Sequence, residues 1–173
     1  MKKFNYIIKK KNESMMKTIK LPNGYEYTGE VKNGKYHGQG SFFFPNGGIY
    51  KGKWKKGKYH GKGSLLFPDG KTYVGSFRNG KRNGQGIQLN SDGTKYVGNY
   101  KDNRKNGKGK FIFADGSKYI GKFKKNNFFG KGNLTFIDGK RYKGEFKNNK
   151  FYSYGKVLFS ISNKKLKKIN EKE

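Results

Sequence analysis

The sequence has no cysteine and only eleven acidic residues, three prolines and two histidines among its 173 residues. Without cysteine the chain has no disulfide framework, no thiolate nucleophile and no site for palmitoyl or prenyl attachment, which suits a reducing compartment. Lys2 at the second position excludes N-myristoylation. The longest apolar runs, such as residues 42–44 and 65–67, are far shorter than the ~20 residues of a membrane-spanning helix. The apolar stretch near Met1 is also too short for a secretory signal.

A 23-residue repeat organises what the sequence has in abundance, glycine and aromatic residues. A tyrosine recurs six times at this step, and glycine follows it two residues later, as in Tyr73-Val74-Gly75 and Tyr96-Val97-Gly98. A Gly-x-Gly pair and an Asn-Gly or Asp-Gly dipeptide complete most repeats, so that 22 of the 27 glycines belong to one pattern. Such regularity predicts an array that is stabilised by contacts between neighbouring repeats, not by one globular core.

Within each repeat the pattern has a period of two, which is typical of β-strands. Tyr119, Gly121 and Phe123 fall on one face of a strand, while Ile120 and Lys122 fall on the other. Because the Asp-Gly dipeptides are strong hairpin signals, each repeat is predicted to be a β-hairpin that needs stacked neighbours for stability. We therefore predict an all-β fold, an elongated, twisted, single-layer antiparallel sheet of stacked 23-residue hairpins with about twelve to thirteen strands.

The same pattern sets the expected turns and domain boundaries. A turn is expected around Asn126 and Asn127, and the glycine between the two aromatic residues is expected to leave space for rings of neighbouring strands. Residues 1–17 are predicted to be a basic N-terminal tail and residues 164–173 a basic C-terminal tail that is a short helix or disordered. The array between them, residues 18–163, begins with a half repeat at 18–26 and continues with repeats that start at 27, 50, 73, 96, 119 and 142.

The full pattern, Y-x-G-x-(F/W)-x-x-G-x-x-x-G-x-G with a later D-G, resembles the MORN (membrane occupation and recognition nexus) repeat over residues 18–160. The repeats that open with Tyr50-Lys51-Gly52-Lys53-Trp54 and Tyr73-Val74-Gly75-Ser76-Phe77 carry it best. The resemblance implies an elongated, curved sheet. It also implies a scaffold of membrane junctions, cytoskeletal rings or ciliary structures, or an accessory module beside lipid-kinase, nucleotide-exchange or methyltransferase domains. Some members of the family bind a partner peptide along the aromatic groove of the sheet.

The chain departs from the family pattern in two ways. The family often has Glu before the second aromatic residue, and here that position is mostly neutral or basic. Its occupants are Glu30, Lys53, Ser76, Asn99, Lys122 and Glu145. The third repeat also has Gln88 and Asn90 where other repeats have apolar residues, and it shifts Ile87 and Leu89 to the opposite face. Gln88 and Asn90 are interpreted either as a tolerated polar substitution or as a polar notch that contacts a partner.

The few acids and histidines form no catalytic pattern. Equivalent turns of neighbouring hairpins are expected about 9.6 Å apart, too far to share a metal ion or to act as a retaining carboxylate pair at about 5–5.5 Å. His37 and His60 share one position in successive repeats, which Phe129 fills elsewhere, so they are interpreted as structural. We expect no enzyme, no catalytic residue, no metal and no cofactor.

The net charge of +30 has three competing explanations. Lys outnumbers Arg 37 to 4, which is what AT-rich codon usage produces without any ligand. Alternatively, lysines hold the chain on an anionic phospholipid surface, where each contributes about 1 kcal/mol. Nucleic acid ranks last because specific phosphate and base contacts favour Arg. The candidate lipid-binding lysines are Lys2, Lys3, Lys9, Lys10, Lys11, Lys51, Lys53, Lys55, Lys56, Lys122 and Lys124.

These observations predict a non-enzymatic scaffold or adaptor. It would bind a peptide or helix of a protein partner along its aromatic face and associate peripherally with anionic membrane or membrane-linked cytoskeleton in the cytoplasm. The candidate partner-binding residues are Tyr50, Trp54, Tyr73, Phe77, Tyr96, Tyr100, Tyr119 and Phe123. The alternatives are an accessory or regulatory subunit of a lipid-signalling enzyme and a nucleic-acid-binding protein. A homodimer through the open ends of the sheet is also compatible with the sequence.

Overall fold

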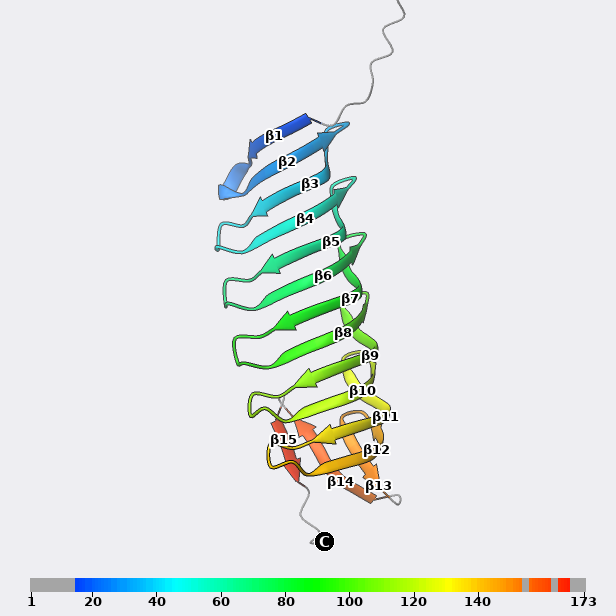
Figure 1. Ribbon diagram of the computed structural model, residues 1–173. Coiled ribbons are helices and arrows are strands. Elements are labelled where there is room, and N and C mark those ends of the chain that lie inside the picture. Colours follow the sequence, from blue (N-terminus) through cyan, green and yellow to red (C-terminus); the bar gives the residue numbers. More distant parts are fainter. Residues whose placement is uncertain (1–14, 154–155, 163–164, 169–173) are drawn as a thin grey trace, which may run out of the picture.

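One antiparallel sheet contains all the strands of the described chain (Figure 1). The computed structural model describes residues 15–153, 156–162 and 165–168. The strands are β1 (Met15–Lys20), β2 (Glu26–Lys32), β3 (Lys35–Phe43), β4 (Ile49–Lys55), β5 (Lys58–Leu66), β6 (Thr72–Arg78), β7 (Lys81–Leu89), β8 (Lys95–Lys101), β9 (Arg104–Ile112), β10 (Lys118–Lys124), β11 (Asn127–Thr135), β12 (Arg141–Lys147), β13 (Lys150–Ser153), β14 (Lys156–Ser162) and β15 (Lys165–Lys168). A 3-10 turn, η1 (Pro22–Gly24), joins β1 to β2.

Strand order in the sheet follows the order in the chain, from β1 to β15. The predicted all-β, single-layer antiparallel architecture is therefore confirmed, and the ladder twists along its length as Figure 1 shows. The described strands exceed the twelve to thirteen expected. One reason is that Lys165–Lys168 pair with β14 as β15, where the sequence suggested a short helix or disorder. At the other end β1 starts at Met15, inside the segment assigned to the N-terminal tail.

Two kinds of turn alternate along the sheet. At the Asp-Gly turns the aspartate folds back on the chain: Asp69 Oδ1 accepts a hydrogen bond from the Lys71 N–H at 3.0 Å, and Gly70 has φ +79°. At the other turns two successive residues have positive φ, as in a type I′ hairpin. Lys125 and Asn126 show this with φ of 49° and 79°, so this turn lies one residue before the predicted position.

The repeated Tyr-x-Gly motif is explained by the close approach of the tyrosine ring to the glycine backbone. Tyr73 is fully buried, and its hydroxyl donates to the Ser76 carbonyl oxygen at 3.0 Å. To reach that oxygen the ring crosses Gly75 and its cross-strand partner Gly86, where an added Cβ would lie 2.5 Å from the Tyr73 hydroxyl oxygen. At Gly75 the ring that fills this space belongs to the same strand and not to a neighbouring one as expected, whereas at Gly144 the Phe151 ring of the neighbouring strand β13 fills it.

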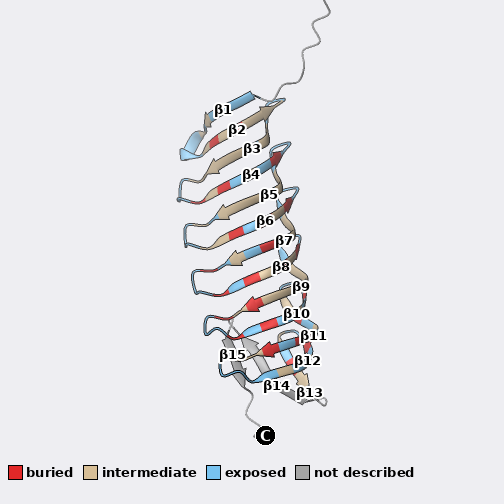
Figure 2. Cartoon of the chain, viewed as in Figure 1, coloured by how far each residue is buried: buried red, intermediate tan, exposed pale blue. Residues whose placement is uncertain are grey.

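A continuous row of edge-to-face aromatic contacts links the repeats. The ring centroid of Phe77 lies 5.3 Å from that of Tyr50 in the preceding repeat and 5.1 Å from that of Tyr73 in its own. Tyr100 repeats the arrangement at 5.2 Å from both Tyr73 and Tyr96. Each such pair contributes about 0.5–1.5 kcal/mol beyond area burial. Figure 2 shows the resulting buried segments at equivalent places along β4, β6, β8 and β10. The core of this sheet is thus a single layer of rings on one face.

Candidate functional site

The eight aromatic residues predicted to bind a partner form the core of the aromatic face. Their side chains are between 0% and 4% exposed. They come from the first strand of each hairpin, in β4, β6, β8 and β10, and each ring is enclosed by its neighbours in the row. Burial raises the pKa of Tyr73 to about 12, and it raises the pKa values of Tyr50, Tyr96, Tyr100 and Tyr119 as well. These residues form the buried layer of the aromatic face, and their direct contact with a partner stays a prediction.

The exposed part of the aromatic face lies over the first two repeats. Tyr36 stacks on Tyr27 with centroids 3.9 Å apart, and Tyr59 stacks on Tyr50 at 3.8 Å. Tyr36, Tyr59 and Phe42 are half-buried, and with Trp54 they line a hollow of about 300 Å³. Trp54 donates from its indole N–H to the Gly40 carbonyl oxygen at 3.1 Å, which holds the ring at the floor of the hollow.

Cations replace these stacked tyrosines in the third and fourth repeats. Arg82 takes the place of Tyr59, and its guanidinium carbon lies 5.5 Å from the Tyr73 ring centroid and 5.2 Å from that of Tyr100. In the next repeat the Lys105 Nζ atom lies 5.1 Å from the Tyr96 ring centroid. Cation–π contacts of this kind contribute about 0.5–2 kcal/mol. Sequence reasoning missed both residues, although aligning residues 36, 59, 82, 105, 128 and 151 at the 23-residue step would have found them.

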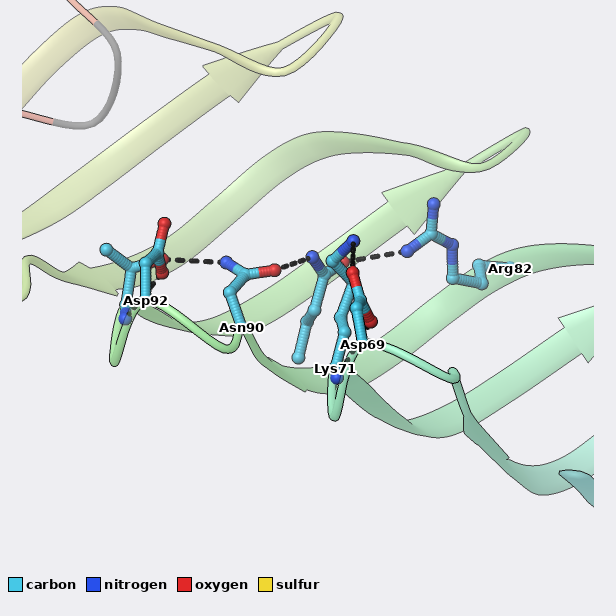
Figure 3. A network of polar contacts seen from close by, with 7 residues as sticks. Asp69, Lys71, Arg82, Asn90 and Asp92 are labelled. Carbon is cyan, nitrogen blue, oxygen red and sulfur yellow. Dashed lines mark hydrogen bonds and ion pairs between the residues drawn. The ribbon is translucent and has the colours of Figure 1, made fainter. Parts of the chain in front are cut away.

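The polar notch of the third repeat is part of a hydrogen-bond network (Figure 3). Arg82 Nη1 donates to Gln88 Oε1 at 2.7 Å, and Gln88 Nε2 donates to Asn90 Oδ1 at 2.6 Å. Asn90 Nδ2 then donates to the Thr94 hydroxyl at 2.7 Å, and Thr94 donates to Asp92. Asn90 is only 5% exposed. The network explains why the polar residues Gln88 and Asn90 are tolerated at positions that are apolar in other repeats. Each buried polar group has a hydrogen-bond partner within the third repeat.

The face opposite the aromatic one carries lysines, as the alternation predicted. Lys51, Lys53 and Lys55 are exposed and alternate with Tyr50 and Trp54. Lys122 and Lys124 lie at the equivalent positions of β10, and Lys56 lies in a turn. The remaining predicted lipid-binding lysines, Lys2, Lys3, Lys9, Lys10 and Lys11, lie outside the described residues. The opposite face also has apolar side chains near its centre, so it is not uniformly basic.

Metal-holding clusters and membrane-spanning helices are both absent from the part of the chain that the structure describes. No three of their histidine and carboxylate side chains gather closely enough to hold a metal ion. Asp69 and Asp138 are bound instead to Lys71 and Lys140 two residues along, and the backbone N–H bonds from these lysines lower the pKa values of both carboxyls. No helix within residues 15–153, 156–162 or 165–168 is long and apolar enough to cross a membrane.

Comparison with family models decides the assignment. The model described as MORN repeat matches six consecutive segments, residues 27–49, 50–72, 73–95, 96–118, 119–141 and 142–161. The chain belongs to the MORN repeat family. Its repeats start where the tyrosine column predicted, and MORN repeats generally serve as non-enzymatic scaffold units.

Two solved structures show partial similarity to this MORN array. One is the TCP domain of SAS-4 (dCPAP) from Drosophila melanogaster in complex with a proline-rich motif of Ana2 (dSTIL). It is 14% identical, with a TM-score of 0.44, over 75% of this chain and 78% of that one. The other is virginiamycin B lyase from Staphylococcus aureus, 8% identical with a TM-score of 0.23 over 89% of this chain and 62% of that one. No curated protein matches the sequence.

Proposed function

We propose that this MORN array is a scaffold that binds an extended or helical segment of a partner protein over its first two repeats. The observation that carries the proposal is the hollow of about 300 Å³ formed by Tyr36, Phe42, Trp54 and Tyr59. Aromatic rings are efficient anchors for a partner because they bury a large area and lose little conformational entropy. A hollow floored by a fixed indole presents such rings to an incoming apolar side chain.

The first two repeats favour this role more than the later ones. In the fifth and sixth repeats, Phe128 and Phe151 hold the position of Tyr59 and are at most 5% exposed, and in the fourth repeat Lys105 holds it. In the third repeat Arg82 and Gln88 satisfy each other at the equivalent place. Among residues 36, 59, 82, 105, 128 and 151, which share one position of the repeat, only Tyr36 and Tyr59 are half-buried aromatic rings.

The test compares variants that other repeats of the chain already justify. Tyr59→Lys copies Lys105 and is combined with Tyr36→Lys, while Ile120→Lys on the opposite face copies Lys51 as the matched control. Each immobilised protein is incubated with cell extract, and the segment of any retained protein is then titrated against the array. Trp54, the single tryptophan, reports binding by its fluorescence.

The proposal requires a protein that wild type and the Ile120→Lys control retain and the double variant loses. Its isolated segment must also change the Trp54 emission, because Trp54 forms the floor of the hollow. Equal retention by all three proteins, or a segment that binds without changing that emission, would overturn it.

A second candidate function is peripheral association with an anionic membrane, and the placement of Lys51, Lys53, Lys55, Lys122 and Lys124 on the sheet supports it. Several lysines near an anionic surface add to a useful affinity. Sedimentation with neutral vesicles and with vesicles that contain phosphatidylserine tests this at low and at physiological salt. Binding that needs anionic lipid and persists in ~0.15 M salt supports it, and loss of binding at that salt contradicts it.

A further inference from the structure

Three adjacent strands place apolar side chains in a row on the face opposite the aromatic core. Val74 in β6 pairs directly with Ile87 in β7, which pairs with Val97 in β8. Val74 is 56% exposed and Ile87 is 44% exposed. Their neighbours in the strands, Tyr73 and Gln88, lie on the aromatic face. The row continues to Ser64 on one side and to Lys110 on the other. The face opposite the aromatic core therefore has an apolar stretch between Ser64 and Lys110, over β6, β7 and β8 in the middle of the strand order.

This row forms one wall of a hollow of about 600 Å³. The backbone of Gly63, Gly75 and Gly86 is part of its lining, and polar side chains line it as well. These polar side chains are Gln39, Lys51, Lys62, Ser64 and Gln85. The hollow thus runs across the strands with hydrophobic side chains on one part of its lining and hydrogen-bonding or cationic side chains on the rest.

The charged side chains that line the hollow are lysines, and the carboxylate of Glu30 in β2 accepts a hydrogen bond from the Gln39 N–H at 2.6 Å. The eight strands from β4 to β11 contain no aspartate and no glutamate. Lys51 and Lys62 line the hollow, and Lys110 stands beside Val97. An occupant that brings carboxylates to these lysines and apolar side chains to the row gains from both kinds of contact.

We propose that an acidic amphipathic helix of a partner protein docks in this hollow, with its axis across β6, β7 and β8. Neighbouring strands lie about 4.8 Å apart, close to the roughly 5.4 Å that a helix rises in one turn. Apolar side chains at helix positions i, i+3 or i+4, and i+7 therefore meet Val74, Ile87 and Val97 in turn. A convex rod fills a hollow, whereas a flat bilayer surface touches its rims.

This docking surface is independent of the partner site proposed over the first two repeats, because Tyr73 and Val74 point to opposite faces of the sheet. The other repeats also supply a variant that removes the apolar row without new chemistry. Lys51 holds the position of Val74 and of Val97 in another repeat, and Ser64 holds the position of Ile87. The triple variant Val74→Lys, Ile87→Ser and Val97→Lys is thus expected to fold, which circular dichroism and thermal melting will confirm.

The test uses two synthetic peptides with the same glutamate-rich composition. One places leucines at i, i+4 and i+7 of a helix, and the other scrambles them. Both are titrated by fluorescence anisotropy against wild type, the triple variant and the Tyr36→Lys/Tyr59→Lys variant of the aromatic face in ~0.15 M salt. The patterned peptide should bind wild type at least about tenfold more tightly than the scrambled one, a preference of about 1.4 kcal/mol. The triple variant should lose this preference and the aromatic-face variant should keep it.

Equal binding of the two peptides to wild type would overturn the proposal, because attraction to net positive charge does not depend on leucine position. A preference that survives in the triple variant would also overturn it. Vesicles of phosphatidylcholine and phosphatidylserine provide the competing occupant. If wild type binds these vesicles and the triple variant does not, and wild type binds the two peptides equally, the apolar row contacts membrane and not a helix.

Discussion

The second and third repeats share one backbone but stabilise it with different side chains. In the second, Tyr59 stacks on Tyr50 with centroids 3.8 Å apart, beside the apolar Leu65. In the third, Arg82 covers Tyr73 and donates to Gln88 at 2.7 Å. Aromatic stacking and a charge-assisted hydrogen bond therefore serve the same position. The MORN backbone thus depends on the Tyr and Gly columns, while the residues that pack over them differ from repeat to repeat.

The hairpin turns within the repeats, which bond to the preceding repeat, differ in a similar way. Gly80 donates its backbone N–H to the Tyr59 carbonyl oxygen at 2.9 Å, a bond to the preceding repeat. Asn103 makes the same backbone bond to Arg82, and its Oδ1 also accepts the Arg82 N–H at 2.8 Å. Asn126 and Asn149 repeat this second bond to Lys105 and Phe128. Later repeats are thus joined by one more hydrogen bond at each turn.

High pH should disrupt both regions together and produce the largest effect. Burial raises the pKa of Tyr27, Tyr59 and Tyr73 to about 12, above the ordinary value of 10. Because the folded state holds these protons more tightly than the unfolded chain, stability is complete below pH 10 and is lost as pH rises toward 12. Circular dichroism and tyrosinate absorbance should change together in that window. Tyrosinate that appears at about pH 10 without unfolding would contradict the burial.

Removing the aromatic ring that joins the first two repeats should be the most damaging single substitution considered. Trp54 contacts Tyr27 at 5.4 Å and Tyr50 at 5.1 Å between centroids, and it fills the space between two hairpins. Trp54→Ala should lower the free energy of unfolding by about 3–5 kcal/mol, measured by urea denaturation. Trp54→Phe, the residue type at position 77, should cost about 1 kcal/mol because it loses only the bond to Gly40 and some contact area. Equal losses for the two variants would contradict this account.

Removing the hydrogen bonds of Arg82 should lower the stability by a smaller amount, and substitutions that copy the second repeat should restore most of it. Arg82→Leu removes the bonds to Gln88 and Asn103 and should cost about 1–3 kcal/mol. The triple variant Arg82→Tyr, Gln88→Leu and Asn90→Phe copies Tyr59, Leu65 and Phe67 of the second repeat. It should recover most of the loss, because the three positions act as a unit. Urea denaturation of the single and triple variants measures the coupling, and additive losses would argue against two exchangeable solutions.

Adding an asparagine side-chain bond between the Gly80 turn and the second repeat, as later repeats have, should produce the smallest change, a gain in stability. Gly80 has φ +82°, and no atom lies within 4 Å of the position that a Cβ would take, so asparagine has room there. In Gly80→Asn the new side-chain oxygen should accept a hydrogen bond from the Tyr59 N–H, as Asn103 Oδ1 does from the Arg82 N–H. The expected gain is about 0.5–1 kcal/mol. Gly80→Ala is the control and should destabilise by about 1–2 kcal/mol, because alanine disfavours positive φ. A higher melting temperature for Gly80→Asn and a lower one for Gly80→Ala, both relative to wild type, would confirm the comparison.

The fold was predictable because its signals are local and recur six times. Tyr119, Gly121 and Phe123 alternate with Ile120 and Lys122, and that period of two alone assigns strands and faces. The exposure of the candidate site residues was not predictable in the same way. Tyr50 and Trp54 were expected on the binding surface, yet they are 0% and 4% exposed. Alternation says which face a ring occupies, but the exposure of that ring depends on how closely the next repeat packs against it.

By itself, the sequence determined the repeat length, the hairpins, the strand order and the separation of aromatic from basic side chains. These follow from residue periodicity and turn chemistry, which act over a few neighbouring positions. Only the tertiary structure decided that Tyr73 lies across its own Gly75, that Arg82 replaces a stacked ring, and that Val74, Ile87 and Val97 form one row. Strand register brings together residues that are distant in the chain, and side-chain packing across that register is not written in any single repeat.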